Sequence, residues 1–284
     1  MIDRRLRVLG PVGFRDLVYS EWGDPKAART LVCVHGLTRC RHDFDTLADA
    51  LADAYRVVSI DVAGRGESDW LPDKGHYDFP LYMADLAALI ARLDVEAVDW
   101  LGTSMGGLIG LFLAAQARAP IRTLILNDVG ARLEAQSLKR ISAYVAWKPR
   151  FETLDVAEAH FREIHAPFGR LTDAQWRRLA QTSTRPHPEG GLTFHYDPKI
   201  GERFKEAPAD KDVELWSYWE PIAIPTLVLR GAQSDLLSAA TVVEMQRRNA
   251  RCDAVDIEGC GHAPGLMAPD QIALVRDWLE RHPG

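Results

Sequence analysis

The sequence lacks an excess of basic residues. It holds 34 Lys and Arg against 40 Asp and Glu, which gives a formal net charge of −6 at pH 7. Nucleic acids and anionic membranes are bound through a basic face, so we expect neither as a partner. Hydrophobic residues make up 47% and charged residues 26% of the chain, a composition typical of a globular protein that buries a large core.

Cysteine motifs and export or membrane segments are also lacking. No Cys-x-x-Cys pair is formed by the four cysteines (Cys33, Cys40, Cys252 and Cys260). The charged residues near the start are followed by no apolar run typical of a secretion signal. The uncharged run from Trp100 to Ala117 is interrupted by glycines, which favours a buried core segment over a membrane span. These absences predict a cytoplasmic location.

Metal-site spacing is missing as well. His160, His165, His187 and His195 are scattered without the short, regular intervals of a metal site. We therefore expect neither a metal nor a cofactor.

What the sequence does contain is a Gly-x-Ser-x-Gly motif from Gly102 to Gly106, with Ser104 at its centre. An apolar, strand-like run precedes the motif, and a helix-like run from Leu108 to Arg118 follows it. A sharp strand-to-helix turn exposes a serine hydroxyl, and the helix start directs free N–H groups and its positive dipole end at a developing oxyanion. The alternative is a structural turn, but the context favours Ser104 as a nucleophile.

A serine nucleophile needs a base and a residue that orients the base, and the downstream sequence offers both. A predicted strand over 225–231 is followed by a loop that contains Asp235. Another predicted strand, over 252–257, is followed by His262 between a glycine and an alanine. The carboxyl ends of parallel strands meet at one sheet edge, so Ser104, Asp235 and His262 are predicted to form a catalytic triad.

Asp128 is a second candidate for the triad acid. It follows a predicted strand over 121–127 and precedes Val129 and Gly130. Asp235 is preferred because the apolar pair Leu236-Leu237 after it is expected to bury it. Asp128 would then be a turn carboxylate that bonds its own backbone.

The order Ser, Asp, His resembles the α/β-hydrolase superfamily, and the likeness extends from about Leu6 to Leu279. The resemblance implies an α/β fold with a mostly parallel central sheet flanked by helices. The segment from Leu31 to Leu37 is similar to the family's third strand and oxyanion turn. Carried over to this sequence, the oxyanion donors are the backbone N–H groups of Leu37 and Met105. The glycine-rich turn over 64–68 is expected to be structural only.

The strand pattern stops between residues 131 and 219, where helix-like runs take its place. This block is similar to the cap of capped α/β hydrolases, so we predict a core domain over 1–130 and 220–284 and a helical cap over 131–219. The helix-like runs are 134–147, 156–165 and 173–182, followed by a Gly/Pro-rich segment over 185–198 and a short run over 213–219. Seven aromatic residues of the block are candidates to line an acyl pocket or to form the cap's own core: Tyr144, Trp147, Phe161, Phe168, Trp176, Trp216 and Trp219.

Four residues are predicted to belong to the substrate pocket: Arg39, Trp147, Trp216 and Leu237. Arg39 follows the oxyanion turn, where a guanidinium could bind a substrate carboxylate through two hydrogen bonds. The alternative for Arg39 is a salt bridge with Asp43 or Asp45.

The predicted function is a serine hydrolase that cleaves small-molecule carboxylic esters of small to medium acyl groups. The same triad serves thioesterases, lactonases, C–C bond hydrolases, perhydrolases and hydrolases of polyester oligomers, and these alternatives stay open. A non-catalytic small-molecule receptor on the same scaffold is the alternative from another functional class. The oligomeric state is not indicated.

Overall fold

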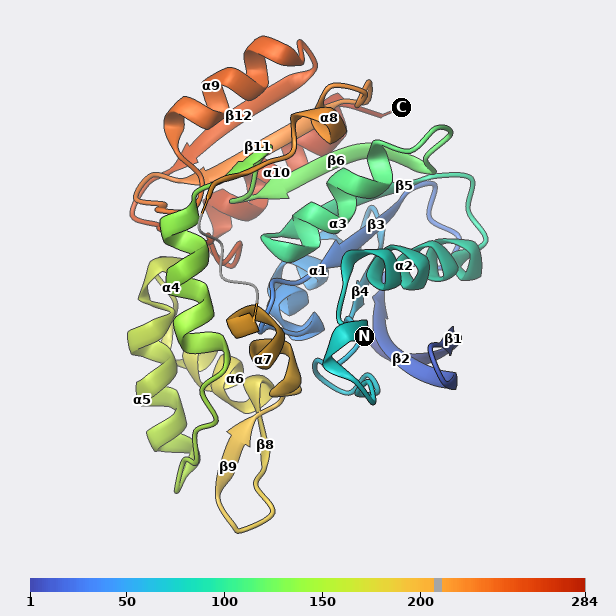
Figure 1. The fold of residues 1–284 in the computed structure, drawn as a ribbon. Coiled ribbons are helices and arrows are strands. Elements are labelled where there is room, and N and C mark those ends of the chain that lie inside the picture. Colours follow the sequence, from blue (N-terminus) through green and yellow to red (C-terminus); the bar gives the residue numbers. More distant parts are fainter. Residues whose placement is uncertain (207–210, 284) are drawn as a thin grey trace.

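A computed structural model describes residues 1–206 and 211–283 of the chain. Its centre is an eight-stranded sheet (Figure 1). In spatial order the strands are β1 (Ile2–Gly10), β2 (Gly13–Trp22), β4 (Arg56–Ile60), β3 (Thr30–Val34), β5 (Val98–Thr103), β6 (Ile121–Asn127), β11 (Thr226–Gly231) and β12 (Cys252–Ile257).

The six strands from β4 to β12 are parallel, whereas β2 runs antiparallel to both of its neighbours, β1 and β4. The central strands are short and almost continuously buried, as is typical of parallel strands covered by helices on both faces. The predicted α/β fold with a mostly parallel sheet is confirmed. Because the parallel strands share one direction, the loops after β5, β6, β11 and β12 meet at a single edge.

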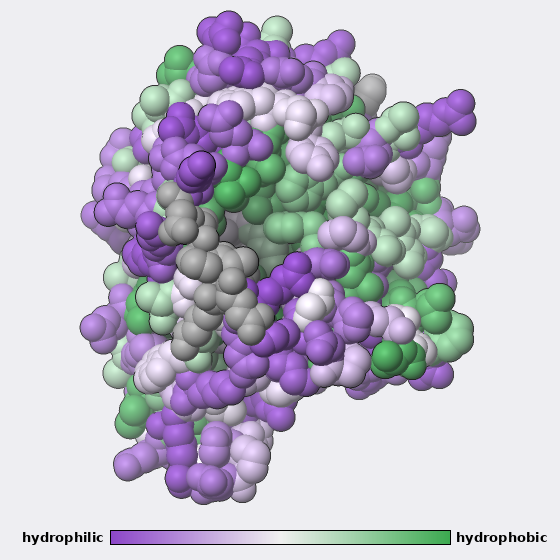
Figure 2. All heavy atoms as spheres, in the orientation of Figure 1, coloured by the Kyte–Doolittle hydropathy of each residue, from purple (hydrophilic) through white to green (hydrophobic). Residues whose placement is uncertain are grey.

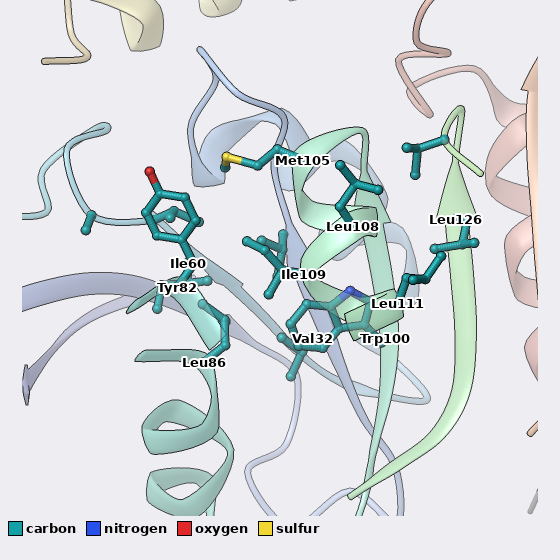
Figure 3. Close-up of a cluster of buried hydrophobic side chains, with 14 of the residues drawn as sticks. Val32, Ile60, Tyr82, Leu86, Trp100, Met105, Leu108, Ile109, Leu111 and Leu126 are labelled. Carbon is teal, nitrogen blue, oxygen red and sulfur yellow. The ribbon is translucent and has the colours of Figure 1, made fainter. Parts of the chain in front are cut away.

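Alternate residues of each strand pack on opposite faces of the sheet. In β3, Val32 and Val34 join a core with α2 (Phe79–Leu93) and α3 (Met105–Ala114), as Figure 3 shows for Val32. Leu31 and Cys33 join a second core with α1 (Asp45–Leu51) and α10 (Pro269–Arg281). The remaining core helix, α9 (Ala239–Arg248), packs beside β12. Three short 3₁₀ helices are η1 (Arg41–Phe44), η2 (Lys74–His76) and η3 (Ala166–Phe168).

A block of helices and short strands is inserted between β6 and β11, and none of its described residues forms a strand of the central sheet. Figure 1 shows α4 to α7 gathered at one side of the sheet, with the β8–β9 hairpin projecting furthest. The elements are β7 (Arg132–Leu133), α4 (Ala135–Val145), α5 (Leu154–Ile164), α6 (Asp173–Ser183), β8 (Thr184–Pro186), β9 (Leu192–Phe194), α7 (Lys199–Glu206), β10 (Val213–Glu214) and α8 (Trp216–Trp219).

The sequence pattern located α4, α5 and α6 of this block but missed α7 and the short strands. The three predicted helices match α4, α5 and α6 to within a few residues. The pairs β7–β10 and β8–β9 were missed, because strands of two or three residues are too short to show an alternating hydrophobic pattern.

Across the described residues, no helix combines the length and apolar character needed to cross a membrane.

Candidate active site

Ser104 lies at the turn between β5 and α3, in a strained backbone conformation. Its φ of 50° and ψ of −113° are unusual for a residue with a side chain. The turn is possible because Gly102 and Gly106 allow close backbone approach. A Cβ on Gly102 would lie 2.2 Å from the Gly106 carbonyl oxygen, and a Cβ on Gly106 would lie 2.0 Å from the Val34 carbonyl oxygen. The motif therefore lifts the serine hydroxyl out of the turn at the sheet edge.

His262 links Ser104 to a carboxylate through both of its ring nitrogens. Its Nε2 lies 3.0 Å from the Ser104 Oγ, and its Nδ1 lies 2.6 Å from an oxygen of Asp128. A carboxylate can only accept hydrogen bonds, so Nδ1 carries a proton and Nε2 is left to accept the serine proton. The Ser104, His262 and Asp128 side chains form a continuous hydrogen-bonded chain with the polarity required for nucleophile activation.

Asp128 is completely buried at the end of β6, and its backbone adopts a left-handed conformation with φ of 55°. One carboxylate oxygen accepts a hydrogen bond from the Gly231 N–H at 2.7 Å. The other accepts from the Ser234 hydroxyl at 2.6 Å, in addition to His262. These donors, from the end of β11 and from the loop that follows it, fix the carboxylate against the imidazole.

The prediction that Asp235 orients His262 is wrong. The Asp235 side chain is 50% exposed and forms a two-point salt bridge with Arg140 of α4, at 2.6 and 2.8 Å. Leu236 and Leu237 do turn into the core, but the chain direction at this point leaves the Asp235 side chain facing solvent. Its neighbour Ser234 is the residue of this loop that faces the site.

Two residues that support the triad were not identified from the sequence. Ser234 donates to Asp128, and Asn127 donates through its amide to the Thr103 hydroxyl and the Pro264 carbonyl. The Asn127 carbonyl also accepts from the Ser104 N–H at 2.9 Å. Asn127 thus joins the ends of β5 and β6 to the loop that carries His262. Its place directly before Asp128 at a strand end was the available signal.

The backbone around Leu37 is held by His35. The Val62 N–H donates to His35 Nε2 at 3.0 Å, so the ring proton sits on Nδ1, which donates to the Gly36 carbonyl at 2.7 Å. Because the peptide unit is planar and trans, fixing the Gly36 carbonyl also fixes the opposite direction of the Leu37 N–H. A Cβ on Gly36 would lie only 3.7 Å from the Ser104 Cβ, so this turn lies against the nucleophile.

Met105 is the first residue of α3, and the N–H groups of a first helical turn have no partner within the helix. The Ser104 side chain caps none of them. The Leu37 turn and the Met105 helix start therefore both lie next to Ser104, and their role as oxyanion donors stays a prediction.

Arg39 is buried and already bonded to protein groups. It forms a two-point salt bridge with Asp43, at 2.6 and 3.0 Å, and donates to the Ser183 hydroxyl at 2.7 Å. It also lies 3.4 Å from His165 Nε2 and over the Phe168 ring, 5.8 Å from the ring centroid. The structure thus selects the salt-bridge alternative for Arg39 and makes it a link between the core and the inserted block.

The other three predicted pocket residues have no described contact with the triad. Trp147 is half exposed and packs against Phe151 and Phe194 inside the inserted block. The Arg248 guanidinium lies over the Trp216 ring, with its Cζ 4.3 Å from the ring centroid. Leu237 is fully buried beside Gly130. Their role in substrate binding stays a prediction.

The inserted block meets the catalytic loop through η3. The Pro167 carbonyl accepts from the Gly261 N–H at 2.8 Å, and the Phe168 carbonyl accepts from the Gly265 N–H at 3.0 Å. His165 stacks on Phe168 with ring centroids 4.5 Å apart. These contacts fix the block on both sides of His262.

Figure 2 shows a hollow lined by hydrophobic residues, near the start of α3 in the view of Figure 1. The hollow lies in the region where the loops after the parallel strands meet. Over residues 1–206 and 211–283, no cluster of three His, Cys, Asp or Glu side chains is arranged to hold a metal ion.

His195 makes stability depend on pH. Its side chain is 4% exposed, and burial, aided by the charge of Arg39, lowers its pKa from 6.5 to about 3. Between about pH 6.5 and pH 3, His195 therefore binds a proton in the unfolded chain but not in the folded chain. Folding stability is unaffected by His195 above about pH 6.5 and decreases progressively as the pH falls toward 3.

We expect the wild-type protein to lose about 2 kcal/mol more stability between pH 7 and pH 5 than a His195→Gln variant. Urea unfolding of both proteins at the two pH values measures the difference. Equal losses would show that His195 takes up its proton as readily in the folded as in the unfolded chain.

Comparison with known proteins gives a consistent result. Residues 31–274 match the Alpha/beta hydrolase family. The chain is 47% identical over 276 residues to 3-hydroxybutyrate-oligomer hydrolase of Cupriavidus necator, covering 95% of this chain and 94% of that protein. It is 26% identical to 2-(acetamidomethylene)succinate hydrolase of Mesorhizobium japonicum, over 83% of this chain and 82% of that protein.

Solved structures agree. A protein of Rickettsia typhi superposes with a TM-score of 0.93 at 33% identity, covering 99% of both chains. An alpha/beta hydrolase of Novosphingobium aromaticivorans superposes with a TM-score of 0.87 at 36% identity, covering 99% of this chain and 98% of that one. The family and the hydrolase class predicted from the sequence are confirmed.

Proposed function

The chain belongs to the alpha/beta hydrolase family, and from this premise we propose that it is a serine esterase whose catalytic triad is Ser104, His262 and Asp128. The observation that carries the proposal is the hydrogen-bonded chain from Ser104 through His262 to buried Asp128. A receptor on the same scaffold has no need of a strained serine aligned with an imidazole and a carboxylate.

The reaction follows from the positions of these groups. Ser104 attacks the ester carbonyl while His262 Nε2 takes the hydroxyl proton, and Asp128 stabilises the imidazolium that forms. The N–H groups of Leu37 and Met105 bind the oxyanion of the tetrahedral intermediate. His262 then protonates the leaving alcohol, and water, activated by the same imidazole, cleaves the acyl-enzyme. This mechanism uses no metal or cofactor.

The proposed substrates are short ester oligomers of 3-hydroxybutyrate. Their support is the 47% identity to an enzyme named for this activity, which extends over nearly the full length of both chains. A slender, mostly apolar oligomer also suits the apolar hollow near the start of α3 (Figure 2). Thioesters, lactones and C–C bonds are served by the same triad, but no observed contact favours them.

The proposal is tested by supplying the 3-hydroxybutyrate dimer and trimer and measuring release of the monomer by NMR. Acyl thioesters, lactones and p-nitrophenyl butyrate serve as competing substrate classes. We expect the oligomers to have the highest kcat/KM. An enzyme that cleaves the thioester or lactone more efficiently, and leaves the oligomers intact, would contradict the proposed substrate.

We further propose that residues 131–219 act as a cap that selects the acyl chain. The support is the bonding of η3 to the loop that carries His262 and the salt-bridged link from Arg39 to Ser183. A cytoplasmic location is also proposed, since all four cysteines are free and buried, as suits a reducing compartment.

If the cap selects the acyl chain, Phe168→Ala is expected to change the preference between the dimer and the trimer. Phe168 lies within η3, against the catalytic loop, and one methylene contact is worth about 1–3 kcal/mol, or roughly 10- to 200-fold in kcat/KM. Trp147→Ala is the matched comparison, because that ring packs within the block.

The measurement is kcat/KM for each chain length in both variants. The contradicting result is a chain-length preference that both variants share with the wild type but that a substitution of Leu237 changes. The acyl pocket would then belong to the core domain, and the inserted block would only exclude solvent.

A further inference from the structure

Arg65 occupies the glycine-rich turn after β4, a turn to which the sequence assigned only a structural role. Its side chain is fully buried. The turn is formed by Gly64 and Gly66, whose φ values of 83° and 53° favour glycine. This backbone directs the guanidinium inward, beneath the two segments that flank the nucleophile.

The guanidinium contacts both residues whose backbone N–H groups are the predicted oxyanion donors, through the carbonyl of Leu37 and the side chain of Met105. Its Nε donates to the Leu37 carbonyl at 2.9 Å, and one Nη lies 3.4 Å from the Met105 sulfur. The other Nη donates to the Ala63 carbonyl at 2.7 Å and to the Tyr82 hydroxyl at 2.8 Å. A single planar group thus connects the turn after β3, the start of α3 and a fixed point on α2.

His35 and Arg65 together hold the peptide units on both sides of Leu37. His35 binds the Gly36 carbonyl, and Arg65 binds the Leu37 carbonyl. The hydrogen bond of His35 fixes the peptide unit that carries the Leu37 N–H, and the hydrogen bond of Arg65 restrains the peptide unit that follows it.

Arg65 is also a buried charge without a carboxylate. Within the part of the chain that the structure describes, no Asp or Glu forms a salt bridge with it, whereas the other fully buried arginine, Arg41, pairs with Asp61. Its charge faces the rings of Tyr77 and Tyr82, at 5.8 and 5.1 Å from their centroids. Burying an unpaired charge is costly, which is unfavourable for stability alone but useful beside a site where negative charge develops.

We propose that Arg65 is the positioning residue of the oxyanion hole. It aligns the Leu37 and Met105 segments and provides an uncompensated positive charge behind them. This inference rests on the proposed esterase function. It requires Arg65 to act on the transition state more than on substrate binding, because the oxyanion exists only after attack.

The test is an Arg65→Met variant, which keeps the side-chain length and removes the charge and the donors. Removing an oxyanion donor outright costs about 10²- to 10³-fold in kcat, so loss of its support is expected to cost about 10- to 100-fold. KM for p-nitrophenyl butyrate is expected to stay within about threefold. The inhibition constant of butylboronic acid, which forms a tetrahedral anion on a catalytic serine, is expected to rise in parallel with the fall in kcat.

Arg65→Lys is the second variant, and it retains the positive charge but not the planar set of N–H donors of a guanidinium. We expect it to lose less than Arg65→Met, about 3- to 10-fold in kcat, with boronic acid binding weakened by the same factor. If Arg65→Met fails to fold, this variant decides the question.

Arg15→Met is the control for lost stability. Arg15 is another buried arginine, paired with Asp85 near the β1–β2 hairpin, and has no described contact with residue 37 or 105. It is expected to lower the melting temperature and to leave kcat and boronic acid affinity unchanged.

Folded Arg65 variants with wild-type kcat and wild-type boronic acid affinity would overturn the inference, as would an effect confined to KM. Failure of the proposed function is recognised separately. In that case the wild-type protein itself turns over no ester and is not labelled by a fluorophosphonate.

Discussion

Ser104→Ala is expected to abolish ester hydrolysis, with kcat falling on the order of a million-fold. The strained turn presents this hydroxyl to His262 Nε2 at 3.0 Å, and alanine leaves the imidazole without a hydroxyl to deprotonate. Alanine removes only the hydroxyl. Since the Ser104 side chain accepts no helix-capping hydrogen bond, the fold is expected to be unaffected.

The measurement is the steady-state rate with p-nitrophenyl butyrate, together with the melting temperature of each protein. A residual rate above about a hundredth of wild type, once contaminating esterases are excluded, would contradict the assignment of the nucleophile. Such a rate would be far too high for an enzyme that has lost the serine of its triad.

Asp128→Asn is expected to lower kcat by about 10⁴-fold. The oxygen of the new amide would remain with the Gly231 N–H, and its NH₂ group would face the Ser234 hydroxyl and the imidazole. His262 Nδ1 would then have to accept a hydrogen bond. The ring proton would move to Nε2, which could no longer take the proton of Ser104.

Asp235→Asn is the matched control, because it makes the same chemical change in the exposed carboxylate that pairs with Arg140. Its kcat is expected to stay within about twofold of wild type, and an exposed ion pair contributes at most about 1 kcal/mol to stability. A large loss of kcat in Asp235→Asn, together with a near-normal kcat in Asp128→Asn, would contradict the observed geometry. It would restore Asp235 as the triad acid.

The fold was predictable because its determining signals are local. Short apolar runs over 31–34, 98–103 and 121–127 identify the parallel strands, and the glycines around Ser104 identify the turn between β5 and α3. The short strand pairs of the inserted block depend on contacts between distant segments. No pattern of two or three residues encodes these contacts.

Ser104 and His262 were predictable because each follows a recognisable strand, and the structure brings them together at the common edge. The acid was not, because Asp128 and Asp235 both follow a strand that ends at this edge. Leu236 and Leu237 are buried as the sequence predicts, but side chains of successive residues in a loop diverge, and Asp235 does not follow them into the core. Which carboxylate faces the imidazole depends on the loop after β11, where Ser234 faces Asp128 and leaves Asp235 in solvent.

The role of Arg65 was hidden for a different reason. Its partners are backbone carbonyls, a phenol and a sulfur atom, so no charged residue elsewhere in the sequence marks its position. Only the folded structure shows that a turn after β4 supports both segments beside Ser104.

The central claim is that Ser104 forms the acyl-enzyme. It is tested most directly by treating the protein with a fluorophosphonate and mapping the adduct by peptide mass spectrometry. We predict one adduct, on Ser104, whose appearance parallels the loss of ester hydrolysis and which is absent in Ser104→Ala. An adduct on another residue, or unlabelled Ser104 in protein that has lost its activity, would contradict the claim.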